Sequence, residues 1–176
     1  MENVFISFAR ANEESDKAFI AILNEMSNED REKNRKSYYG SLSSLTRHVM
    51  GGTFYFLSLF TETVANNPAA LKALEPFGKI EFPKAKKLSE EDWKKVVADL
   101  KIVDKAYIEF VSALKDKDFS LPVKIDWYKG KPPTVPLYFM LQQLVAHNIH
   151  HRGQISQILD SLKIDNDYSG INVKFL

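Results

Sequence analysis

Residues 136–162 read PLYFMLQQLVAHNIHHRGQISQILDSL, and this apolar-periodic segment decides the fold. Its apolar side chains recur every three or four positions, which is typical of one face of an α-helix. Pro136 suits a first helical turn, so we predict a helix from near Pro136 to about Leu162. His147 and His151 lie four residues apart in this segment and project from the same face. Two such imidazoles can bind one cation, and a transition metal then needs a further ligand from another element.

Three segments upstream share this helical spacing. Apolar residues recur from Phe5 to Met26, and the charged run at residues 29–36 ends that stretch. A second apolar stripe stops at residues 66–68, Asn-Asn-Pro. Ser89 is a good N-cap for a third stripe, because acidic residues follow it in the first turn. We therefore predict helices over roughly residues 5–26, 41–65, 89–114 and 136–162.

The connections between these helices differ in character. Residues 75–88 contain two prolines, a glycine and clustered lysines, and we interpret them as a long crossover loop. Residues 119–127 alternate apolar and polar side chains and precede a Lys-Gly-Lys-Pro-Pro turn, which predicts a short strand or hairpin. The tail from Tyr168 to Phe175 has a weak strand character. We therefore expect an all-α fold over a single domain, residues 1–176: a four-helix bundle with a long crossover loop and a minor β hairpin.

Composition excludes several classes of function. The 176 residues are 44% hydrophobic, which is enough for one well-filled core. With 24 basic and 23 acidic residues, the net charge of +1 favours neither nucleic acid nor an anionic membrane. The chain has no cysteine, so histidine and carboxylates are the plausible metal ligands. No secretory signal and no run of about 18 apolar residues is present, and we expect a cytoplasmic protein.

His48 is the natural third ligand for a metal, because it lies well inside the predicted second helix. Gly51, Gly52 and Tyr55 follow it on the same face of that helix. Each glycine costs a helix interior roughly 1 kcal/mol relative to alanine, so something should compensate. A close contact between helices is one explanation, an open cavity beside His48, roofed by Tyr55, is the other, and both can hold together. His150 ranks second as a ligand, because it lies three residues from His147.

Gln143, His147, His151 and Gln154 form a narrow polar stripe along the last predicted helix. Apolar residues border the stripe on the side that should face the core. Burying two imidazoles and two amides without partners would cost several kcal/mol, by order of magnitude. A bound metal would remove that cost, and so would a packed, hydrogen-bonded set of histidines with no metal.

The pattern His147-x-x-x-His151-Arg152-Gly153-Gln154, together with His48 on the second of four helices, resembles the DinB-like metalloprotein family. The resemblance covers nearly the whole chain. It implies a four-helix bundle with a long crossover, a divalent metal held by His48, His147 and His151, and often a homodimer. Relatives commonly carry acidic residues and a tryptophan after the first histidine, where this chain has Gly51-Gly52 and then three aromatic residues.

Two functional hypotheses follow from this resemblance. The family includes metal-dependent transferases that use low-molecular-weight thiols, among them bacillithiol transferases and a mycothiol-dependent maleylpyruvate isomerase. On that reading the three histidines hold Zn²⁺ or Ni²⁺, a metal-bound thiolate attacks a small-molecule electrophile, and Gln143 or Gln154 orients a ligand. Tyr55 is then a candidate hydrogen-bond donor. The alternative is a non-catalytic, stress-associated protein in which the metal joins helices two and four.

Overall fold

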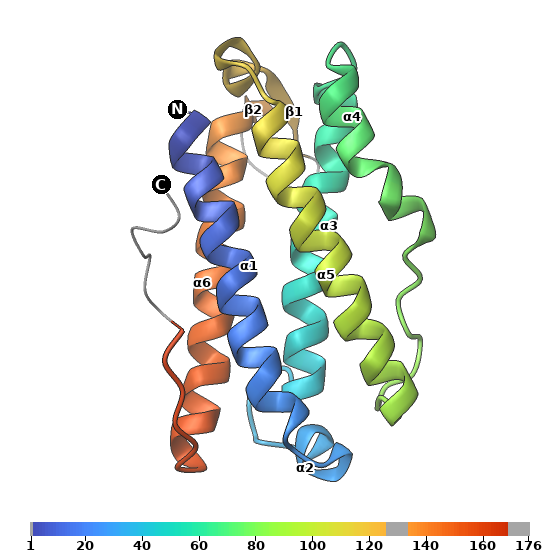
Figure 1. The fold of residues 1–176 in the computed structure, drawn as a ribbon, viewed down its shortest axis with the longest axis vertical. Coiled ribbons are helices and arrows are strands. Elements are labelled where there is room, and N and C mark those ends of the chain that lie inside the picture. Colours follow the sequence, from blue (N-terminus) through green and yellow to red (C-terminus); the bar gives the residue numbers. More distant parts are fainter. Residues whose placement is uncertain (1, 126–133, 169–176) are drawn as a thin grey trace.

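Four long helices dominate the structure, a computed structural model that describes residues 2–125 and 134–168. They lie side by side along the long axis of the molecule (Figure 1). This arrangement confirms the predicted all-α fold. The long helices are α1 (Glu2–Asn24), α3 (Leu42–Thr63), α5 (Glu90–Ala113) and α6 (Leu137–Ser161). The short elements are α2 (Asn28–Glu32), α4 (Pro68–Leu74), the 3₁₀ turns Glu75–Lys79 and Asp116–Ser120, and the strands β1 (Pro122–Lys124) and β2 (Thr134–Pro136).

Three of the four long helices begin at the residues whose local chemistry predicts a helix start. The Ser41 hydroxyl accepts a hydrogen bond from the backbone N–H of Ser44, and this caps α3. Ser89 caps α5 through a capping box with Asp92, in which each side chain bonds the other residue's backbone N–H. Pro136 immediately precedes α6. The predicted starts at Ser89 and Pro136 are therefore confirmed.

Two of the predicted connections prove to be helical in part. Asn67 does not simply end α3, since its side chain accepts a hydrogen bond from Ala70 N at 3.2 Å and caps α4. The expected loop at residues 75–88 begins with the 3₁₀ turn Glu75–Lys79. Only its remaining part, residues 80–88, has neither helix nor strand. The charged run at residues 29–36 overlaps α2, which spans Asn28–Glu32. Arg31 in this run is 1% exposed and stacks 4.9 Å from the centre of the Trp93 ring.

The predicted β hairpin is present in shortened form. Strands β1 and β2 pair antiparallel, with Val123 opposite Val135. Phe119 belongs to a 3₁₀ turn, so the strand predicted over residues 119–127 covers Pro122–Lys124 in the described part. The predicted turn at residues 129–133 and the tail residues beyond Tyr168 lie outside the described residues. Tyr168 itself has no regular secondary structure.

The core fills the space between the four long helices. The rings of Phe60 on α3 and Phe110 on α5 stack with their centres 5.7 Å apart, and both side chains are fully buried. Full burial of a side chain of this size stabilises the fold by about 1.5–3 kcal/mol. Helix α6 packs chiefly against α3, and α1 packs chiefly against α5. The close contact between α3 and α6 brings the predicted metal ligands together.

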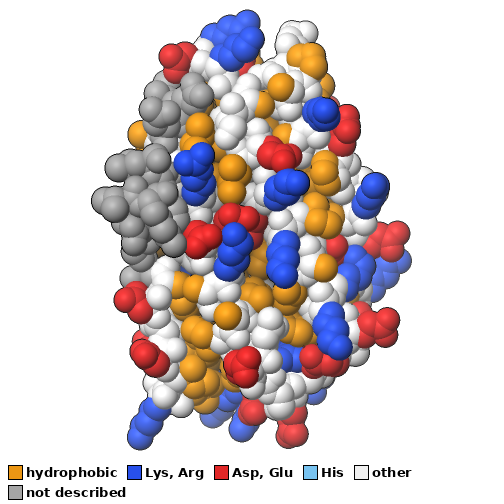
Figure 2. Space-filling view, in the orientation of Figure 1, with side chains coloured by type: hydrophobic (Ala, Val, Ile, Leu, Met, Phe, Trp, Pro, Cys, Tyr) orange, Lys and Arg blue, Asp and Glu red, His pale blue; other side chains and the backbone are white. Residues whose placement is uncertain are grey.

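The surface carries charges of both signs. Figure 2 shows basic and acidic side chains interspersed over one face, in keeping with the net charge of +1. Within the described residues, each helix is too short or too polar to cross a membrane.

Candidate metal centre

Three histidines meet between α3 and α6. His48 comes from the second turn of α3, and His147 and His151 come from successive turns of α6. The Nε2 atom of His48 lies 3.1 Å from Nε2 of His147 and 3.1 Å from Nε2 of His151. Imidazole nitrogens bound to one tetrahedral zinc ion at about 2.0–2.1 Å are separated by roughly 3.4 Å. The two distances to His48 are close to this value, and the three ligand atoms all lie within 4.8 Å of one another, so the group could hold a single metal ion.

Hydrogen bonds on the outer side of two rings determine which nitrogen is free to bind a metal. His147 Nδ1 lies 3.1 Å from the amide oxygen of Asn148, and His151 Nδ1 lies 2.8 Å from the amide oxygen of Gln154. An amide oxygen only accepts, so in both histidines Nδ1 carries the hydrogen. The Nε2 lone pairs of both rings then face Nε2 of His48. Outer partners of this kind fix the tautomer and orientation of metal-binding histidines.

Asn148 is itself held in place from the opposite side. It is 1% exposed, and its amide nitrogen donates to Asn12 Oδ1 at 2.8 Å and to Thr53 Oγ1 at 2.9 Å. These two bonds orient the amide so that its oxygen faces His147. The ring orientation of His147 thus depends on contacts with both α1 and α3.

Burial keeps the three imidazoles neutral. It is the main cause that lowers the pKa of His48 to about 4, and the neighbouring His151 and His147 lower it further. Burial also lowers the pKa values of His147 and His151. Protonated histidine cannot bind a metal. At neutral pH the site therefore presents three deprotonated nitrogens to a cation.

The two glycines of α3 have different surroundings. A Cβ atom at Gly52 would lie 2.1 Å from Cε1 of His147 and 2.8 Å from its Nε2. No real side chain tolerates such distances, so the imidazole occupies the space that a side chain at position 52 would need. A Cβ at Gly51 would meet only Phe82 Cε1, at an ordinary 3.5 Å. Of the two explanations for the glycine pair, Gly52 supports the close helix contact.

Tyr39 is a site residue that the sequence did not reveal. Its hydroxyl lies 2.8 Å from Nε2 of His48, and the two rings stack with their centres 4.2 Å apart. It lies in the turn before α3, which closes through Gly40 at a positive φ of 79°. The Tyr-Gly pair before a capping serine signals a turn, but it does not show which tyrosine faces the histidine.

The other residues singled out in the sequence differ in how close they lie to the three histidines. Tyr55, expected as a roof over His48, is 46% exposed and lies beside Phe56, and Tyr39 occupies the place against His48 instead. Gln143 is exposed on α6. Gln154 contacts His151 as described above, and its amide nitrogen lies 3.3 Å from Nε2 of His150. His150 is exposed, outside the group of three.

A groove of about 740 Å³ leads to His48 from the surface. Tyr39 and Phe82 form part of its wall, and the positive charges of Arg47, Lys86 and Lys87 outnumber the negative charge of Glu32 in the same groove. Arg47 Nη1 donates to the backbone oxygens of Pro83, at 3.2 Å, and Ala85, at 2.8 Å. These bonds fasten the segment between the 3₁₀ turn and α5 along the groove. A small anionic molecule has the charge that this entrance attracts.

Comparison with known proteins identifies the family of this chain. The DinB family model matches residues 1–162. The chain belongs to the DinB family. Neither the curated proteins nor the solved structures contain a significant match to it. For this DinB-family chain, the three convergent imidazoles are the arrangement that could hold a metal ion.

The low pKa of His48 predicts how the stability of the metal-free protein depends on pH. Unfolded His48 takes up a proton near its ordinary pKa of 6.5, whereas folded His48 does so only near 4. The unfolded state therefore binds more protons between these values, and the free energy of unfolding should fall as the pH drops from about 6.5 to about 4. Urea unfolding in chelator should show a smaller fall for His48→Gln. His150→Gln, at an exposed position, is the control and should change this fall less than His48→Gln does. A wild type and a His48→Gln variant with the same pH dependence would contradict this assignment.

Gly52→Ala should weaken metal binding, and Gly51→Ala provides a matched control. Both substitutions improve helix propensity in α3 by the same roughly 1 kcal/mol. Only the methyl group at position 52 would displace the His147 ring. We expect Gly52→Ala to reduce Zn²⁺ affinity by roughly ten- to a hundredfold in competition with a chromogenic chelator, as for other losses of ligand orientation. Gly51→Ala should bind Zn²⁺ like the wild type, and equal affinities of the two variants would refute the contact.

Proposed function

We propose that the protein binds one divalent transition-metal ion, Zn²⁺ or Ni²⁺, through His48, His147 and His151 and acts as a metal-dependent transferase on a low-molecular-weight thiol. The observation that carries the metal assignment is the convergence of Nε2 lone pairs from His147 and His151 on Nε2 of His48 at 3.1 Å. A proton on His48 can satisfy only one of these two lone pairs at a time. A cation at their centre would satisfy all three nitrogens at once.

The donor set suits such a metal and favours thiol chemistry. Imidazole binds zinc and nickel well, and three neutral ligands leave the ion's full charge uncompensated. A bound ion would supply Lewis acidity that lowers the pKa of a thiol toward neutral pH. The group consists of three histidines, and within the described part of the chain no carboxylate joins it that could serve as a general base for hydrolysis. A thiol is far more acidic than water and therefore depends less on a general base, so a thiol nucleophile fits this site.

The protein's own side chains supply binding and orientation. Asn148 and Gln154 hold the His147 and His151 rings by their Nδ1 hydrogens. The Tyr39 hydroxyl, 2.8 Å from Nε2 of His48, is positioned to hydrogen-bond a molecule that enters the groove. The positive charges along that groove favour a thiol or electrophile that carries an anionic group.

The second candidate function is a non-catalytic, stress-associated metal protein. In this case the ion would link α3 to α6 and contribute to folding. The position of the histidines between these two helices favours it. We also infer, from the family resemblance, that two copies of the chain associate as a homodimer, which light scattering on the purified protein would test.

Metal analysis tests the ligand assignment. Tag-free protein loaded with Zn²⁺ and dialysed should contain one metal ion per chain by elemental analysis, because three ligands converge on one position. His48→Ala, His147→Ala and His151→Ala should each lose most of it. His150→Ala, which removes an exposed histidine beside the site, should retain a full complement. A full complement in all four variants would exclude this set of ligands.

Metal removal distinguishes the two candidate functions. For a transferase with a preformed site, chelation should leave the far-UV circular dichroism spectrum nearly unchanged, because the large apolar core does not depend on the ion. The loaded protein should then accelerate the reaction of an anionic thiol such as coenzyme A with an alkyl halide or epoxide, and the His48→Ala variant should not. Unfolding on chelation, with no rate acceleration by the loaded protein, would instead support the structural role.

A further inference from the structure

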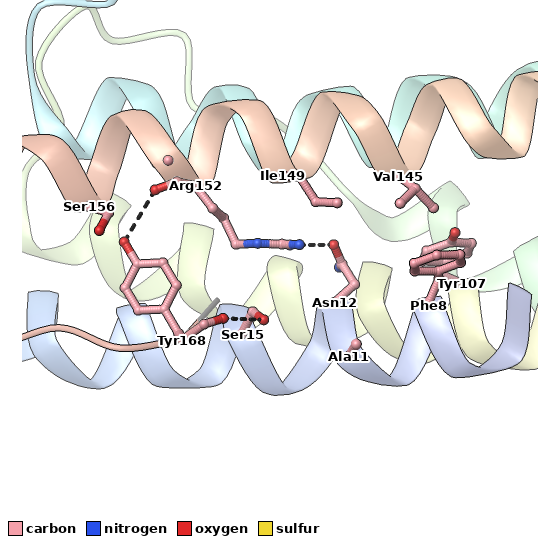
Figure 3. A pocket seen from close by; sticks show the side chains of 11 residues that line it. Phe8, Ala11, Asn12, Ser15, Tyr107, Val145, Ile149, Arg152, Ser156 and Tyr168 are labelled. Atoms are coloured by element: carbon pink, nitrogen blue, oxygen red, sulfur yellow. Dashed lines mark hydrogen bonds between the residues drawn. The ribbon is translucent and has the colours of Figure 1, made fainter. Parts of the chain in front are cut away.

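A second cavity lies on the opposite side of α6 from the histidines. It has a volume of about 230 Å³ and lies along the seam between α1 and α6 (Figure 3). Phe8 and Ala11 from α1 and Val145 and Ile149 from α6 give it mainly apolar walls. Tyr168 closes one end, where its backbone oxygen accepts a hydrogen bond from Ser15 Oγ at 2.9 Å. The cavity is larger than the roughly 150 Å³ that suffices for a benzene ring in a protein interior.

The side chain of Tyr107 lines this cavity, and its hydroxyl group is buried without a hydrogen-bond partner among the described residues. Tyr107 projects from α5, is 1% exposed, and lines the cavity together with Phe8 and Val145 (Figure 3). Leaving a buried hydroxyl unpaired costs a fold about 1–3 kcal/mol. Burial raises the pKa of Tyr107, so the group stays a neutral phenol that can donate a hydrogen bond.

Charged groups beside the cavity already neutralise one another. Arg152 Nη1 lies 3.1 Å from Asp16 Oδ1 and also donates to Asn12 Oδ1. Asn12 donates in turn to Asp16 Oδ2 and Asp104 Oδ1, both at 3.0 Å. Burial and the adjacent Asp16 raise the pKa of Asp104 well above its usual range, which favours the neutral form of this carboxyl. One guanidinium thus faces one carboxylate, and no net positive charge is left to attract an anion.

We propose that this cavity binds a small uncharged molecule with a single-ring or similar apolar body and one oxygen that hydrogen-bonds the Tyr107 hydroxyl. The apolar walls would bury the body of the ligand, and the neutralised Arg152 would disfavour a carboxylate or phosphate. This ligand class is the opposite of the anionic molecules that the groove at His48 attracts. The proposal does not depend on the metal centre.

Three probes of similar size test the proposal on the full chain: p-cresol, toluene and benzoate. Toluene lacks the oxygen, and benzoate carries a charge. Titrations followed by amide chemical shifts should show saturable binding of p-cresol at α1, α5 and α6. The affinity for p-cresol should exceed that for toluene by roughly five- to tenfold, the value of one net hydrogen bond. Benzoate should bind more weakly than toluene.

Variants identify the residue and the cavity. Tyr107→Phe should lower p-cresol affinity to that of toluene, leave toluene affinity unchanged, and preserve stability, because it removes only an unpaired hydroxyl. Tyr138→Phe, the same change elsewhere on the protein, should retain the preference for p-cresol. Val145→Phe places a ring in the cavity and should abolish binding of both compounds, while His48→Ala should leave it intact. The proposal is overturned if p-cresol does not saturate, if Tyr107→Phe leaves its affinity unchanged, or if His48→Ala removes the binding.

Discussion

The close approach of α3 and α6 is the constraint on which the site depends. An imidazole of His147 can lie against α3 only because residue 52 has no side chain, as the 2.1 Å distance to a Cβ built there shows. The cost of a glycine in a helix interior is about 1 kcal/mol, and it is offset by the packing that the missing side chain permits. The same approach places His48 within 3.1 Å of the two α6 imidazoles.

The fold was largely predictable because its main determinants are local. Helical periodicity relates residues three or four positions apart, and a cap such as Ser89 bonds a residue three positions away. Both signals can therefore be recognised from neighbouring residues in the sequence. The short helices were missed because their stability comes from distant contacts. In α2, the Arg31 side chain is buried because it stacks on the ring of Trp93, which lies far away in the sequence. The Asn67 side chain donates to Ala113 O and to Asp118 Oδ2, both at 2.9 Å, and no spacing rule anticipates these bonds.

In the candidate site, too, the local features were predictable from the sequence and the long-range contacts were not. The four-residue spacing of His147 and His151 fixes their common face, and the structure brings His48 to them. Tyr39 could not be placed from the sequence, because its position depends on how a turn folds back over α3. Asn148 gave no signal either, since its partners on α1 and α3 are far away in the chain. Local pattern thus identified the side chains that converge, while the groups that orient them required the three-dimensional structure.

Helix α6 carries polar side chains on two buried faces, which an ordinary bundle helix avoids. His147 and His151 face α3, whereas Asn148 and Arg152 face α1. The polar atoms of the α1 side form one connected set with Asn12 at its centre, so burial there leaves few groups unpaired. Among the described residues around this set, the Tyr107 hydroxyl stands apart as a buried group without a partner. The neighbouring polar groups have hydrogen-bond partners, and the Tyr107 hydroxyl does not. In our proposal the oxygen of a bound ligand supplies the partner that the chain itself does not provide.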